Sequence, residues 1–131
     1  MRTIEIVDQS KVFSLTEARD ILPLIKSITL SHYEELGPIQ YKLDRMLSND
    51  PRRARIERQF QAVVDAWCGK ISRLGVSASN LWEVEFDVGV EGALNWRHPE
   101  LDLAYFRPKG QTLRKKLTDY VEENDPDWAL L

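Results

Sequence analysis

The 131-residue sequence is poor in cysteine, glycine and proline and has no long apolar run, and each of these features excludes a class of protein. Its one cysteine excludes a disulfide framework and a cysteine zinc cluster, and six glycines with six prolines are too few for a low-complexity chain. No apolar run approaches the ~20 residues of a membrane span, and the start lacks the apolar core of a signal peptide. A formal net charge of −3 argues against a generally basic nucleic-acid binder. We therefore expect a single cytoplasmic domain over residues 1–131, without membrane association.

An apolar repeat with alternating spacings of three and four is the strongest positive signal, and it predicts a helical hairpin over residues 13–75. Ser14 and Glu17 form a capping-box pattern at the start of the first helix. Gly37-Pro38 lies inside that helix. Because the repeat continues in register past the proline, the sequence favours a kink over a break.

The second helix is expected to begin with Asp50-Pro51 as its N-cap and first helical residue, and to end at Gly75. Only a few residues separate the two helices, so they must run antiparallel in a coiled-coil-like pair. Folding the chain at this link places His32 opposite Trp67. We expect these two side chains to pack against each other in the seam between the helices.

After Gly75 the apolar period changes to two, which predicts a three-stranded antiparallel meander over residues 80–107. A weak amphipathic pattern predicts a short helix with an acidic tail over residues 111–123. The expected fold class is α+β, with the sheet and short helix at the base of the hairpin. The tip of the hairpin, around residues 44–58, is expected to protrude.

The helical opening FSLTEARDILP, followed by Gly75-Val76, LNWR and AYF, resembles an uncharacterised bacterial family, domain-of-unknown-function family two thousand two hundred and three. The resemblance covers roughly residues 13–107. It implies a similar fold and a bacterial, cytoplasmic setting, but no established activity. Members often carry Cys-Trp and Trp-His where this chain has Asn95-Trp96 and Phe106-Arg107, so no metal or thiol chemistry carries over from the family.

Candidates for catalysis or metal binding are few. The hairpin could bring His32 near Cys68, but nothing nearby supplies an oxyanion hole or an orienting group, so we expect no catalytic dyad. His32 and His98 lie on different predicted elements, and no metal-ligand spacing occurs. The sequence therefore predicts no cofactor and no metal, and it leaves enzymatic activity uncertain and not favoured.

An acidic row lies on one face of the first predicted strand, at Glu83, Glu85 and Asp87. Such a row could bind a divalent cation or act as a carboxylate pair. We favour a solvated face, and Arg97 on the next strand is expected to lie on the same face, where it could pair with the row.

Arginines gather at the predicted hairpin tip, at Arg52, Arg53, Arg55 and Arg58. Residues 51–75 carry a net charge of +4, whereas residues 1–50 and 76–131 carry −2 and −5. Cations in the first turn of a helix are disfavoured by the helix dipole, which suggests a use elsewhere. Two interpretations stay open: a solvated face partly neutralised by nearby acids, or a binding site for an anionic partner.

These observations favour a non-catalytic scaffold or protein-interaction module with an unidentified protein partner. The alternatives are a nucleic-acid or anion-binding accessory that uses the arginine tip, and a small enzyme or ligand carrier with a pocket between sheet and hairpin, beside Trp82 and Trp96. Exposed aromatic residues also predict a homodimer. A sheet with one packed face cannot cover all of Trp82, Trp96, Tyr105 and Phe106, and the first helix is expected to expose Tyr33 and Tyr41.

Overall fold

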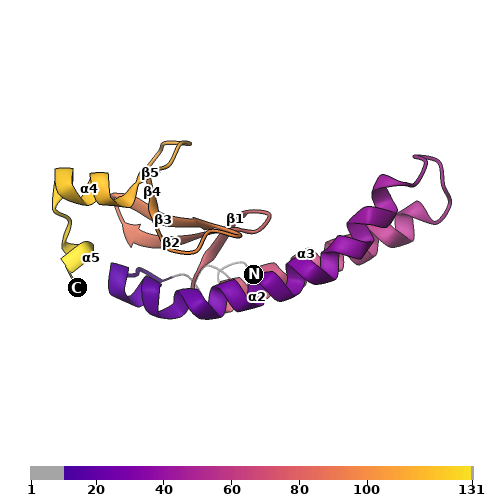
Figure 1. Ribbon diagram of the computed structural model, residues 1–131, viewed down its shortest axis with the longest axis horizontal. Coiled ribbons are helices and arrows are strands. Elements are labelled where there is room, and N and C mark those ends of the chain that lie inside the picture. Colours follow the sequence, from indigo (N-terminus) through magenta and orange to yellow (C-terminus); the bar gives the residue numbers. More distant parts are fainter. Residues whose placement is uncertain (1–10, 131) are drawn as a thin grey trace, which may run out of the picture.

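A long antiparallel helical hairpin and a five-stranded antiparallel sheet form the protein, as seen in a computed structural model that describes residues 11–130 (Figure 1). The hairpin consists of α2 (Leu15–Asp44) and α3 (Arg53–Arg73). The sheet lies over the half of the hairpin where α2 begins, and the opposite end extends well beyond the sheet (Figure 1). The predicted α+β class, with a meander at the base of a protruding hairpin, is confirmed.

Reciprocal hydrogen bonds fix the start of α2. The Ser14 hydroxyl accepts from the Glu17 amide at 3.1 Å, and the Glu17 carboxylate accepts from the Ser14 amide at 3.0 Å. The capping box is therefore present as predicted, and it satisfies two donors that the helix leaves unpaired. The helix then runs without a break through Pro23 and Pro38.

The start of α3 differs from the prediction. Asp50 is not the N-cap: its carboxylate accepts a hydrogen bond from the Arg52 amide at 2.8 Å, which closes a turn before the helix. Arg52 occupies the N-cap position, and no side chain caps the helix there. The prediction was wrong because the short Asp50 side chain satisfies a turn amide two residues ahead, and this delays the helix until Arg53.

The end of α3 agrees with the prediction. Gly75 has a φ of 83°, a conformation that glycine adopts without steric cost. The amide of Val76 donates to the Ile71 carbonyl at 3.3 Å, and the amide of Gly75 donates to the Ser72 carbonyl at 2.9 Å. This pair of bonds is a Schellman motif, which satisfies the last carbonyls of the helix and turns the chain toward the sheet.

The seam between the helices contains a buried polar contact. The Trp67 indole, 1% exposed, donates to the Thr29 hydroxyl at 2.9 Å. His32 is also buried, and its Nδ1 lies 2.8 Å from the Ile28 carbonyl. The hydrogen bond of Trp67 thus goes to a residue one turn before His32, and direct packing of the His32 and Trp67 rings stays a prediction.

The sheet has five strands in sequential order rather than three. They are β1 (Ser77–Asn80), β2 (Glu83–Gly89), β3 (Gly92–Arg97), β4 (Tyr105–Pro108) and β5 (Lys115–Lys116). The two additional strands are short and exposed, so they carry no apolar alternation that would reveal them. The third predicted strand also begins later, at Tyr105, because Leu101 lies in a loop and is 79% exposed.

One face of the sheet packs on the hairpin. Phe13, just before α2, meets Phe86 of β2 edge-on with ring centroids 5.3 Å apart. Trp82 lies in the turn between β1 and β2, with a φ of 63°. It is partly buried, and its ring lies edge-on to Trp67, with centroids 5.1 Å apart. The buried core contributed by the strands comprises Val84, Phe86, Val88, Leu94, Trp96 and Phe106.

Two short helices, α4 (Leu117–Asn124) and α5 (Asp127–Leu130), complete the fold. The predicted helix over residues 111–123 was too long at its start, since β5 occupies part of that segment. Tyr120 and Trp128 stack on Phe106, with ring centroids 4.1 and 5.3 Å apart. Phe106 and Trp96 are 0% and 1% exposed, whereas Trp82 and Tyr105 are partly exposed.

Replacing the buried indole tests the seam. Because Trp67 packs in the core and donates to Thr29, Trp67→Ala should lower the free energy of unfolding by about 3–5 kcal/mol, measured by chemical denaturation. Trp67→Phe should cost less, since it retains most of the packing. Tyr41→Ala, at a position 62% exposed, is the control and should leave the midpoint nearly unchanged. Equal stability of Trp67→Ala and wild type would contradict this packing.

Candidate functional site

A shallow cavity of about 340 Å³ lies at the tip of the hairpin, between the end of α2 and the start of α3. We call it the tip groove. The antiparallel hairpin brings its two walls together from opposite sides of the connecting turn. Its lining residues are Tyr41, Lys42, Arg45, Met46, Arg52, Arg55 and Ile56.

The charge of the tip groove is uniformly positive. Four of its seven lining residues are basic and none is acidic. Over residues 41–58 the chain carries six basic and three acidic side chains, a net charge of +3, in a protein whose overall charge is −3. The positive charge is therefore concentrated at the projecting end, away from the sheet (Figure 1).

Arg52 is held beside the groove by Asp50. Its Nη2 donates to Asp50 at 2.9 Å, and its Nε donates at 3.2 Å. Hydrogen bonds from the Arg52 side chain and amide lower the pKa of Asp50 to about 2. This pairing partly neutralises Arg52, as the solvated-face interpretation expects.

Arg53 has a structural contact that the sequence did not reveal. Its guanidinium donates to the Leu43 carbonyl at 3.2 Å and lies 3.4 Å from the Met46 carbonyl, where α2 ends. It also pairs with Glu57 at 3.1 Å. Since the last carbonyls of a helix lack partners within the helix, Arg53 stabilises the turn.

Arg55 and Arg58 are exposed, and within residues 11–130 neither has an ion-pair partner. Arg45 extends over the Tyr41 ring at 5.0 Å from its centroid. Lys42 and Arg45 were not among the predicted tip residues, because they lie at the end of α2, before the connecting turn. Antiparallel pairing of residues 42–45 with residues 52–55 was the signal that could have found them.

Apolar side chains are also exposed at this end of the hairpin. Tyr41 is 62% exposed and Leu47 is 75% exposed. Arginine and aromatic residues are enriched in protein–protein interfaces and among the residues that contribute most to binding. The hairpin tip thus combines positive charge with accessible apolar area.

Two of the three acids of the row on β2, Glu83 and Glu85, belong to a paired network. Glu83 pairs with Arg97 at 3.0 Å, as its parity predicts, and Glu85 pairs with Arg107 at 2.5 Å. The buried Asn95 amide donates to Glu83 at 2.7 Å and to Glu85 at 3.2 Å. The interpretation as a solvated face holds for Asp87, which is exposed, and is wrong for Glu83 and Glu85, because cross-strand partners on β3 and β4 enclose these two carboxylates.

Burial opposes ionisation of Glu83, but hydrogen bonds from Asn95 and Arg97 outweigh burial and hold its pKa below the ordinary value of 4.5. Arg114 extends the network by donating to Asn95 at 3.1 Å and to Glu100 at 2.6 Å. Because these groups satisfy one another, the network is suited to fixing the outer face of the sheet. In the part of the chain that the structure describes, no group of three or more His, Cys, Asp or Glu residues could hold a metal ion.

Cys68 is half-buried on α3, and burial, with a smaller contribution from Asp65, raises the pKa of its thiol. A raised pKa lowers the fraction of the reactive thiolate at neutral pH. The arrangement thus provides no activation of Cys68 as a nucleophile.

A pocket beside both Trp82 and Trp96 was expected, but the hollow found there has Trp96 and not Trp82 in its lining. This hollow of about 290 Å³ lies next to Trp96, lined also by His98 and Pro99.

Among the described helices, none is long and apolar enough to cross a bilayer. Comparisons with models of protein families, with curated proteins and with solved structures found no match to this chain.

Arg53 and Arg58 at the tip should differ in how much each stabilises the folded protein. Because Arg53 contacts the end of α2, Arg53→Gln should lower the free energy of unfolding by about 1 kcal/mol. Arg58→Gln removes an exposed charge and should change it by less than ~0.5 kcal/mol. Urea denaturation of both variants measures the difference. Equal stabilities would show that the contacts of Arg53 do not stabilise the turn.

Proposed function

We propose that this protein is a non-catalytic, cytoplasmic protein-interaction module whose hairpin tip binds an acidic surface on a partner protein. The observation that carries the proposal is the tip groove, which has four basic residues and no acidic one at the projecting end of an acidic protein. The sheet packs on the other end of the hairpin, so the tip is free to approach a partner (Figure 1). Membership of the bacterial family named above remains part of this proposal.

Exposed apolar side chains favour a protein partner over a nucleic acid. Tyr41 and Leu47 offer area that a phosphate backbone would not use, whereas a protein surface can bury it. Tyr41 is the one aromatic residue among those that line the groove, so the groove has no series of rings that could stack on successive bases. These features support recognition of a compact acidic patch.

Nucleic-acid binding is the second candidate, because Arg55 and Arg58 are exposed cations that could meet phosphates. The two candidates differ in salt dependence. The logarithm of the affinity for a duplex falls linearly with the logarithm of salt, with a slope near −0.9 for each contacted phosphate.

The tip can be tested by capture from a lysate with matched variants. Arg45→Gln/Arg55→Gln removes two groove cations but leaves the contacts of Arg52 and Arg53 intact. We expect wild type to retain a partner protein that this variant loses, with unchanged melting temperature. Mass spectrometry identifies the retained protein, and titration with the purified partner should show an affinity loss of tenfold or more.

Lys70→Gln/Lys109→Gln is the control, since it removes the same charge from exposed positions outside the groove. It should retain the partner as wild type does. Equal retention by the Arg45→Gln/Arg55→Gln variant would contradict the proposal. Release of the partner by nuclease treatment would instead favour the nucleic-acid candidate.

Self-association stays a prediction, and fewer exposed aromatic residues support it than the sequence indicated. Of the aromatic residues named for it, Tyr33 and Tyr41 on α2 are well exposed, whereas Trp96 and Phe106 are buried in the core. We propose that two hairpins pair through these exposed tyrosines. Light scattering at high micromolar concentration should give the mass of two chains, and a mass of one chain would contradict the dimer.

A further inference from the structure

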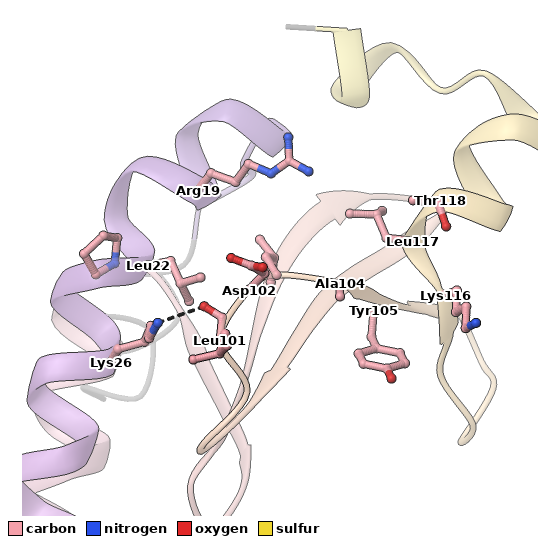
Figure 2. Close-up of a pocket in the computed structure, with 12 residues that line it drawn as sticks. Arg19, Leu22, Lys26, Leu101, Asp102, Ala104, Tyr105, Lys116, Leu117 and Thr118 are labelled. Atoms are coloured by element: carbon pink, nitrogen blue, oxygen red, sulfur yellow. Dashed lines mark hydrogen bonds between the residues drawn. The ribbon is translucent and has the colours of Figure 1, made fainter.

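A second and larger cavity, of about 850 Å³, lies at the opposite end of the hairpin from the tip groove. The N-terminal half of α2 forms one wall, and the loop before β4 together with the start of α4 forms the other (Figure 2). Its volume is within the range of small-molecule sites, ~300–1,000 Å³. We call it the base cavity.

The base cavity has an apolar lining beneath charged groups. Leu22, Leu103 and Leu117 form its buried floor, and Leu101 and Pro23, which are exposed, provide accessible apolar surface above that floor. They come from α2, the loop before β4, and α4, so the apolar surface exists only in the folded chain. An aliphatic or aromatic body of a ligand could lose its contact with water on this surface.

Three basic residues and one acidic residue also line the base cavity, which gives its lining a net charge of +2. Arg19 and Lys26 lie on α2, and Lys116 lies on β5. The acid is Asp102, whose carboxylate is directed toward α2 (Figure 2). In a protein with a net charge of −3, this surplus favours an anionic ligand.

The cations differ in how they are held. Lys26 Nζ donates to the Leu101 carbonyl at 2.8 Å, and this bond ties the loop to α2 (Figure 2). An ammonium group has three donors, so two remain for a ligand. Arg19 and Lys116 have no ion-pair partner among residues 11–130. The cavity thus has donors that the fold does not use.

We propose that the base cavity binds a small amphipathic carboxylate, with the carboxylate at Arg19 and the apolar body against Leu101, above the floor formed by Leu22, Leu103 and Leu117. An arginine fork matches the two oxygens of a carboxylate. The adjacent leucines distinguish such a ligand from a small hydrophilic anion. This site is separate from the tip groove and does not depend on the function proposed for the tip.

Calorimetric titration of the full-length protein at low salt tests the charge and the chain of the ligand separately. Octanoate is the probe, octylammonium has the same chain length with the opposite charge, and acetate has the charge without the chain. We expect saturable binding of one octanoate per chain, with affinity at least tenfold higher than for either control. Equal binding of octanoate and octylammonium, or no octanoate binding, would overturn the proposal.

Variants of residues that line the base cavity provide a second test of the proposal. Arg19→Gln should weaken octanoate binding about tenfold, whereas Asp102→Asn should strengthen it by removing a repulsive charge. Both residues are exposed, so melting temperatures should stay close to that of wild type. Arg58→Gln at the tip is the control and should bind octanoate as wild type does. Unchanged affinity in both Arg19→Gln and Asp102→Asn would place the ligand elsewhere and overturn the assignment.

Discussion

Burial of Trp67 joins the two parts of the protein. Its indole donates to Thr29 across the helical seam, and its ring also meets Trp82 in the turn that leads into the sheet. The same side chain therefore holds α2 against α3 and holds the hairpin against the sheet. A buried indole without a partner would lose the free energy of a hydrogen bond, so this bond favours the helix register in which Thr29 faces Trp67.

This anchoring at the base explains why the hairpin can project. The sheet, α4 and α5 cover the apolar surface near the start of α2, and the stacked rings of Phe106, Tyr120 and Trp128 enclose that end. The distal half of the hairpin is stabilised by its own seam and by the contact of Arg53 with the end of α2. The tip thus needs no covering layer, and its surface residues are available for recognition.

The outer face of the sheet and the two cavities differ in their charged side chains. On the outer face of the sheet, cross-strand pairs neutralise Glu83 and Glu85, so these carboxylates stabilise the sheet instead of binding a cation. At the tip and at the base cavity, basic residues outnumber acidic ones. The paired charges lie on neighbouring strands of the sheet. The basic side chains of the tip groove lie at the tip of the hairpin, and those of the base cavity lie on α2 and β5.

The sequence by itself determined the hairpin, its capping box and the stop at Gly75, because these depend on local spacing and on the conformational freedom of glycine. It also identified the arginines of the second helix. Only the tertiary structure decided the strands β1 and β5, the enclosure of Asn95, and the place of Lys42 and Arg45 beside Arg52. Short edge strands form because a neighbouring strand supplies their hydrogen bonds, and their own residues do not show an apolar alternation. The base cavity likewise joins residues from α2, the loop before β4 and α4, which meet only when the core packs.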